Sequence, residues 1–136
     1  MYAELICDSM GVHISAELQQ LVLRVKGIDK VVLISDSFVS EEEAPEDLRY
    51  VTDLSFDASG DLSGSRLTLD AACRNIMAHT NCGIAQAFLM ASRNPARAIG
   101  MDDEIGTIAV GKKANLVFVD DMFHVKEVML NGVLQK

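Results

Sequence analysis

Two short apolar runs, separated by one amphipathic segment, constrain the fold of this chain most strongly. Residues 5–7 and 31–34 are continuously apolar, as expected for strands that are buried on both faces of a sheet. Between them, Ser15 has the character of a helix N-cap, and Lys26-Gly27 supplies a basic last turn and a glycine stop. An apolar stripe at helical spacing is formed by Leu18, Leu21, Val22 and Val25. Strand, helix and strand in this order predict a parallel βαβ unit and hence an α/β fold.

The remainder of the chain changes character twice. Residues 37–61 contain an acidic run and a proline, which favour an exposed excursion, and after residue 104 the pattern becomes β. The predicted elements are a short strand at 51–56, helices at 67–79, at 84–92 and from Asn94 onward, and strands at 116–119 and 125–130. The last strand leads into Asn131-Gly132, a strong hairpin signal. We therefore expect two parts, residues 1–104 and residues 105–136.

Composition excludes several classes of protein. The formal net charge of −8 disfavours nucleic-acid binding, which needs a basic surface. No apolar run approaches the roughly 20 residues that span a bilayer, and the N-terminus lacks an export signal, so we expect no membrane association. The three cysteines follow no metal-binding or disulfide spacing, which indicates reduced core cysteines and a cytoplasmic location. Because an apolar strand begins almost at Met1, we expect the chain to be a segment of a longer protein.

Two polar residues follow the two predicted parallel strands. His13 comes after the first strand, and Asp36 comes two residues after the second. Side chains at the carboxyl ends of parallel strands converge on one edge, where α/β enzymes place their catalytic groups. An aspartate there could move protons during hydrolysis. Ordinary roles stay open at this stage, since an aspartate often caps a turn and a single histidine is often a hydrogen-bonded structural residue.

A small-residue segment, residues 61–65, precedes the helix predicted from residue 67. Free backbone N–H groups at a helix N-terminus can hold an anion or a carbonyl oxygen, although capping by Ser65 or Thr68 explains the same residues. Lys112 and Lys113 read as a solvated hairpin pair. The histidine and acidic spacings give no complete metal site.

Together these segments resemble the C-terminal end of the N-acetylglucosamine-6-phosphate deacetylases, within the amidohydrolase superfamily. The resemblance is carried by residues 3–8 with Val12-His13, by residues 32–37, by residues 62–70, and by residues 91–120. It implies the last two strands and the following helices of a (β/α)8 barrel, plus the C-terminal strands of a small β-sandwich. It also implies that Asp36 is the general acid/base and can contact the metal, that His13 contacts the substrate, and that Ser63 and Gly64 line the sugar pocket.

The resemblance also implies what this chain lacks. In the family a divalent metal, zinc or iron, is held by a glutamate and two histidines from earlier strands. We therefore expect the chain alone to bind no metal and to be inactive, and the longer protein to deacetylate an N-acetyl amino-sugar phosphate. His13 stands further from the preceding aspartate than is usual in the family, which leaves room for another N-acyl sugar.

Two alternatives remain from the sequence. The chain could belong to an amidohydrolase that cleaves a different C–N bond, since the segment 91–120 is common to many of them. It could also be a non-catalytic module that associates with itself. Unpaired strand edges and apolar helix faces favour pairing with another copy, so we expect a homo-oligomer.

Overall fold

A parallel pair of strands with a helix between them lies at the centre of the computed structural model, which describes residues 1–38 and 40–136. Strand β1 (Ala3–Ile6) pairs along its length with β2 (Val31–Ile34), and α1 (Ala16–Lys26) connects them. The Ser15 side chain accepts a hydrogen bond from the helix, and the helix ends at Gly27, whose φ is 76°. The predicted βαβ unit and the α/β class are confirmed.

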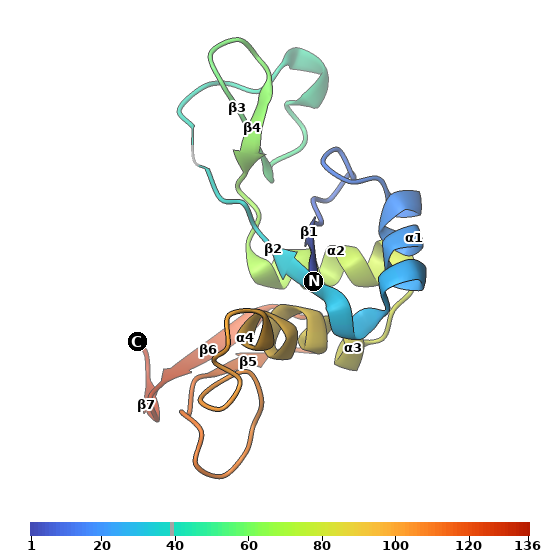
Figure 1. Ribbon diagram of the computed structural model, residues 1–136. Helices are drawn as coiled ribbons and strands as arrows, with labels where there is room; N and C mark the ends of the chain where they lie inside the picture. Colours follow the sequence, from blue (N-terminus) through green and yellow to red (C-terminus); the bar gives the residue numbers. More distant parts are fainter. Residues whose placement is uncertain (39) are drawn as a thin grey trace.

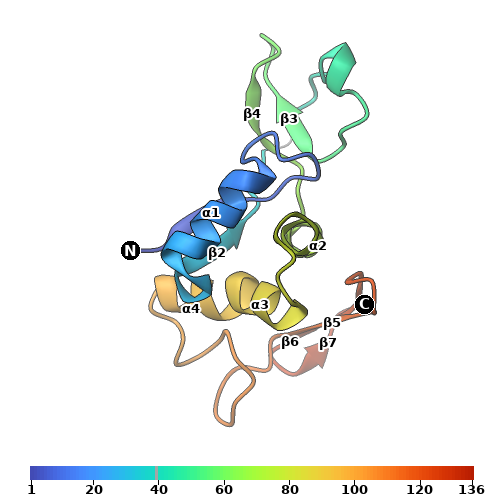
Figure 2. The same ribbon diagram turned by 90° about the vertical axis from the view of Figure 1, so that its right-hand side faces the viewer.

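Two further sheets and a group of helices surround this pair (Figure 1). The remaining helical elements are η1 (Ile28–Lys30), η2 (Glu46–Leu48), α2 (Leu69–Thr80), α3 (Ile84–Phe88), η3 (Leu89–Arg93) and α4 (Asn94–Ala98). The remaining strands are β3 (Leu54–Phe56) and β4 (Leu62–Ser65), which form an antiparallel hairpin, and β5 (Leu116–Val119), β6 (Val125–Leu130) and β7 (Val133–Leu134), which form an antiparallel sheet. Figure 2 shows α1 lying across β2, with α3 and α4 running beneath them.

The three helical pieces α3, η3 and α4 form one continuous rod. The predicted third helix does begin at Asn94, but η3 is a π-helical turn that joins it to α3 without a break. Pro95 has no N–H to donate, and such a residue commonly perturbs the helix turn before it. The buried Asn94 amide donates to the carbonyls of Ile28 and Val31, each at 2.7 Å, and thereby ties this rod to the start of β2.

Burial corrects two expectations about the βαβ unit. β2 is buried nearly throughout, whereas in β1 only Leu5 is buried and Glu4 is exposed. The prediction that the apolar stripe of α1 is buried is also wrong in part. Leu18, Leu21 and Val25 are exposed, and Gln19 is the buried residue of this helix. Both differences have one cause, because in the described part of the chain nothing covers the outer side of β1 or this face of α1.

The main core joins the βαβ unit, α2 and α3 to the C-terminal sheet. Its buried residues are Leu5, Cys7, Val31, Leu33, Leu67, Ala72, Cys73, Ile76, Ala87, Met90 and Phe123. Burial raises the pKa of both the Cys7 and the Cys73 thiols to about 12, as expected for inert core cysteines. No helix in the described ranges has the length and apolarity needed to cross a membrane.

Phe123 anchors the β5–β6 connection to this core. Its ring centroid lies 4.8 Å from that of Phe88, and its carbonyl accepts a 2.8 Å hydrogen bond from Arg74. Its φ of 64° is unusual for a bulky residue, which shows that packing outweighs a local backbone cost.

We expect Phe123→Ala to lower the free energy of unfolding by about 3–5 kcal/mol, because it empties a buried aromatic site. Chemical denaturation followed by circular dichroism measures this change. Phe118→Ala is the matched control, since Phe118 is 42% exposed and its loss should have a much smaller effect. Equal losses in the two variants would contradict the anchoring role of Phe123.

Candidate active site at the strand ends

The carboxyl ends of β1 and β2 lie at the same edge because the strands are parallel and in register. His13 lies in the loop that follows β1, and Asp36 lies two residues after β2. The β3–β4 hairpin stands beyond this edge, at the end toward which β2 points (Figure 1). The predicted site residues therefore come from three segments that meet at one end of the central pair.

Asp8 determines the conformation of the β1 loop. It is fully buried, and its carboxylate accepts N–H hydrogen bonds from Met10 at 3.1 Å, Val12 at 2.9 Å and His13 at 2.9 Å. Burial opposes ionisation of Asp8, but the hydrogen bonds from Val12 and His13 outweigh it and lower its pKa. The long spacing between Asp8 and His13 is thus taken up by a loop that folds back onto the aspartate.

The His13 ring is bonded on one side only. Its Nδ1 lies 3.1 Å from the Asp8 carboxylate, and its side chain is only 9% exposed. Its Nε2 is buried and has no hydrogen-bond partner among the described residues. Since buried polar atoms are nearly always paired, this nitrogen is a candidate contact for a ligand.

Asp36 is held by its backbone, and its side chain remains free. Its carbonyl accepts from the Ser65 N–H at 3.0 Å, while the Ser65 hydroxyl donates to the Ser35 carbonyl. Asp36 itself is exposed, and its carboxylate makes no hydrogen bond within the described part of the chain. Its φ of 49° is tolerated by aspartate more readily than by most residues. The arrangement fixes the backbone of Asp36 and leaves its side chain exposed to solvent.

The segment 62–65 is a strand, which corrects the predicted turn before a helix. It forms β4, paired with β3, and the helix starts later, at Leu69. Ser63 is the extra residue in this pairing, a bulge opposite the step from Ser55 to Phe56. Bulges redirect side chains, and the Ser63 hydroxyl is buried without a partner among the described residues. Ser65 accepts from the Leu67 N–H at 3.0 Å, but Leu67 precedes the helix, so Ser65 is not its cap. Thr68 occupies the N-cap position without a side-chain cap bond.

Gly64 allows the hairpin to contact the strand end. A Cβ built on Gly64 would lie 2.8 Å from the Cβ of Phe38 and 3.0 Å from the carbonyl oxygen of Asp36. Its φ of 135° is also a conformation that residues with side chains rarely adopt. Gly64 thus brings β4 against the segment that carries Asp36.

A second aspartate, Asp53, fastens the hairpin to the β1 loop. Its carboxylate accepts from the Ser9 N–H at 2.7 Å and from the Ser9 hydroxyl at 3.0 Å. The same loop is supported from below by His79, whose Nε2 lies 3.3 Å from the Ser9 carbonyl. From the sequence, Asp8 was noted only for its spacing from His13, and no role was assigned to Asp8 or Asp53. The available signal was an aspartate directly after a buried strand, but its partners are backbone N–H groups that no motif specifies.

The described residues do not form a metal centre on their own. They contain no group of three or more histidine, cysteine or acidic side chains placed to hold an ion. The Nδ1 of His13 is bonded to Asp8, His79 bonds to Gln19, and His124 is paired with Asp120.

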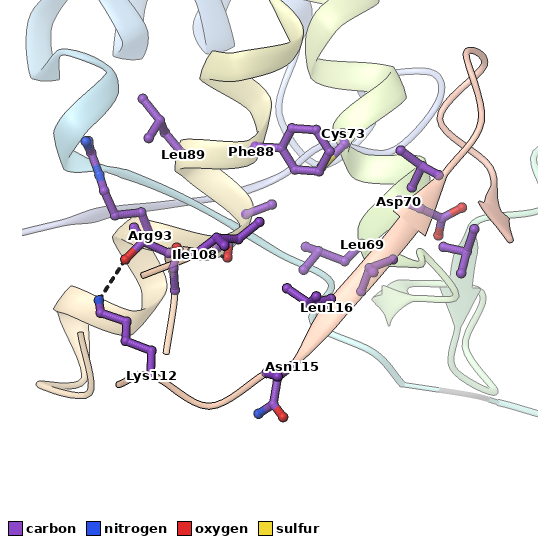
Figure 3. A pocket seen from close by; sticks show the side chains of 18 of the residues that line it. Leu69, Asp70, Cys73, Phe88, Leu89, Arg93, Ile108, Lys112, Asn115 and Leu116 are labelled. Atoms are coloured by element: carbon purple, nitrogen blue, oxygen red, sulfur yellow. Dashed lines mark hydrogen bonds between the residues drawn. The ribbon is translucent and has the colours of Figure 1, made fainter. Parts of the chain in front are cut away.

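A cavity of about 670 Å³ lies elsewhere, between the helices and the C-terminal sheet (Figure 3). Its walls come from α2, α3, η3, β5 and the segment 106–115. None of the four predicted site residues lines it. Lys112, at its rim, donates to the Thr107 hydroxyl at 2.7 Å and to the Asp102 carbonyl, and Lys113 pairs with Glu104 at 2.5 Å. The expectation of a solvated pair is therefore wrong for Lys112, whereas Lys113 is exposed, as expected.

We expect Gly64→Ala to destabilise the chain by more than Gly100→Ala. Both glycines have positive φ, so both substitutions incur a backbone cost of roughly 1–2 kcal/mol, but a Cβ on Gly100 meets nothing within 4 Å. Only the first should also shift the backbone amide resonances of residues 35–38. Chemical denaturation and two-dimensional NMR measure the two effects. Unchanged resonances at 35–38 in a folded Gly64→Ala chain would rule out the close approach.

The chain matches a known protein family along most of its length. The sequence pattern of the Amidohydrolase family matches residues 15–134. An N-acetylgalactosamine-6-phosphate deacetylase of Escherichia coli O157:H7 is 43% identical over 77 residues, covering 57% of this chain and 20% of that protein. The N-acetylglucosamine-6-phosphate deacetylase of Haemophilus influenzae is 30% identical over 142 aligned positions, covering 97% of this chain and 36% of that protein.

A solved structure supports the same relationship. The N-acetylglucosamine-6-phosphate deacetylase of Pasteurella multocida superposes with a TM-score of 0.84 at 26% identity, over 99% of this chain and 37% of that one. The chain thus spans less than half the length of the relatives it matches. Because the family pattern covers most of its residues, the chain belongs to the amidohydrolase family.

Proposed function

We propose that this chain is the C-terminal part of a hydrolase that removes the acetyl group from an N-acetyl amino-sugar phosphate. The proposal rests mainly on buried polar atoms at the strand ends that have no hydrogen-bond partner. Only three buried side-chain polar atoms in the described residues lack a partner, and two of them belong to His13 and Ser63, for which the family resemblance implies a role in substrate binding. The third belongs to Ser55. Unpaired buried polar atoms are costly unless a ligand satisfies them.

The architecture proposed for the longer protein follows from the same relatives. β1 and β2 would be the last two strands of a (β/α)8 barrel, and β5, β6 and β7 would belong to a small β-sandwich. A boundary near residues 104 and 105 stays a prediction. The uncovered outer side of β1 and the exposed apolar face of α1 support this proposal, since a neighbouring strand and helix would bury both.

Asp36 would move the protons of the reaction. In amide hydrolysis the oxygen of water bonds to the acetyl carbon, and the C–N bond breaks. Asp36 would accept a proton from the attacking water and donate it to the nitrogen as it leaves, which yields acetate and the free amine. His13 would hold or polarise the substrate, and Ser63 with the Gly64 backbone would line the sugar pocket.

A divalent metal, zinc or iron, belongs to the proposal for the longer protein. It would supply an activated water, with ligands from outside this chain and with Asp36 as its contact from this chain. The substrate could be either sugar phosphate named for the relatives, N-acetylglucosamine-6-phosphate or N-acetylgalactosamine-6-phosphate. We also propose a cytoplasmic location, which the three free cysteines support.

A chimera tests the proposed function directly. This chain would replace the matching segment of the Haemophilus influenzae enzyme, and amine release would be measured with both sugar phosphates. We expect activity on at least one of them, and a decrease in kcat of about 10²- to 10⁴-fold for Asp36→Asn, because the proton carrier is lost. The exposed Asp121 provides the matched control, Asp121→Asn, which should leave kcat unchanged.

Two outcomes of the chimera experiment would contradict different parts of the proposal. A folded, metal-loaded chimera that hydrolyses neither substrate would contradict the proposed function. Full activity in the Asp36→Asn chimera would leave the enzyme class intact and remove Asp36 from the mechanism.

The isolated chain should contain no stoichiometric metal and release no amine from either substrate. Its described residues hold no metal cluster, and one carboxylate alone does not generate hydroxide at neutral pH. Plasma mass spectrometry and the same amine assay check both expectations. Stoichiometric zinc or iron in the purified chain would mean that it completes a site by itself.

A second candidate is a non-catalytic, self-associating module. It is favoured by the apolar residues that the C-terminal sheet exposes, which include Val117, Phe118, Val125, Leu130, Val133 and Leu134. Large exposed apolar surfaces commonly mark association sites. Measurement of the mass of the isolated chain in solution tests the predicted homo-oligomer. A dimeric chain, together with a chimera that shows no activity, would favour this candidate. An amidohydrolase that cleaves another C–N bond would instead appear as a folded, metal-loaded chimera that is inactive on both sugars.

A further inference from the structure

Asp8 is built as a receptor for one side of His13. Its carboxylate accepts three backbone N–H groups from the loop that it organises, and it lies 3.1 Å from Nδ1 of the His13 ring. An ionised carboxylate can only accept hydrogen bonds, so the ring nitrogen that faces Asp8 must carry a proton. In the neutral imidazole, the other nitrogen, Nε2, is then a bare acceptor.

We propose that Asp8 is the positioning residue of the site: it fixes the ring of His13 and its tautomer, so that Nε2 is the atom that meets the substrate. Asp8 itself touches no reacting atom. The hydrogen bond from the backbone N–H of His13 to the same carboxylate fixes the backbone that carries the ring. The contact between Nδ1 and the carboxylate fixes the rotation of the ring. This proposal rests on the function proposed above, but it makes a claim about the chain alone.

A second aspartate–histidine pair in the same chain shows what is special about Asp8. Asp120 accepts from the backbone N–H groups of Met122 and His124, and its carboxylate lies 3.4 Å from the Nδ1 of His124. This pair is open to solvent, since the His124 side chain is 56% exposed whereas that of His13 is 9% exposed. Asp120 is also shared with Lys126, at 2.9 Å. The His124 ring is therefore free to exchange tautomers through water, and the His13 ring is not.

NMR of the 136-residue chain tests the tautomer without any reaction. Long-range proton–nitrogen spectra of the neutral rings report which nitrogen carries the proton. We expect a single form for His13, protonated at Nδ1, and averaged tautomers for His124. In Asp8→Asn the His13 signals should lose this preference, whereas Asp120→Asn should leave them unchanged. A proton on Nε2 of His13 in the unaltered chain would overturn the proposal, whether or not Asp8→Asn folds.

The chimera tests the consequence for catalysis. Asp8→Asn should lower kcat/KM by roughly 10- to 100-fold, by analogy with the loss of a carboxylate that orients a metal-bound histidine. If Asp8 acts through His13, the double variant Asp8→Asn/His13→Leu should be no slower than His13→Leu alone. Additive losses would show that Asp8 has only a structural role. A chimera that is inactive from the start would contradict the proposed function, and the NMR result would still decide the role of Asp8.

Discussion

The buried strand β2 is the constraint on which the rest of the structure depends. Its backbone pairs with β1 along one edge, the Asn94 amide binds the carbonyl at its start, and the Ser65 hydroxyl binds the Ser35 carbonyl just past its end. Every buried backbone group needs such a partner, so these contacts place the helical rod at one end of the strand and the β3–β4 hairpin at the other. Asp36 emerges between the strand and the hairpin, and its position follows from both.

Sequence patterns located β2 because a continuous apolar run has few alternatives. The same patterns predicted the buried face of α1 only in part. Leu18, Leu21 and Val25 have the spacing of a buried stripe, yet they lie on a surface that nothing in the described residues covers. The patterns missed β4, because Ser63 and Gly64 have low strand propensity and the strand exists only through its distant partner β3. Local spacing can predict an element that has its own apolar run, as β2 does, but not a strand of small polar residues that depends on pairing alone.

The residues of the candidate site also fall into two groups, those that local sequence indicates and those whose contacts arise only in the folded chain. The positions of His13 and Asp36 at one edge of the sheet were predictable, since each follows an apolar strand and the two strands are parallel. The role of Asp8 was not, although this residue stands closer to its strand than His13 does. Its partners are backbone N–H groups whose convergence on one carboxylate results from the folded loop, and no residue type encodes them.

Two kinds of unsatisfied surface remain in the described residues, and they call for different partners. The exposed apolar residues of α1 and of the C-terminal sheet would be satisfied by any well-packed protein surface, because hydrophobic burial is not directional. The buried Nε2 of His13 and the buried hydroxyl of Ser63 need a donor or an acceptor at a defined place. Hydrophobic contact cannot supply that. Any apolar protein surface can therefore cover the exposed residues of α1 and of the C-terminal sheet, whereas His13 and Ser63 require a polar partner at the strand ends.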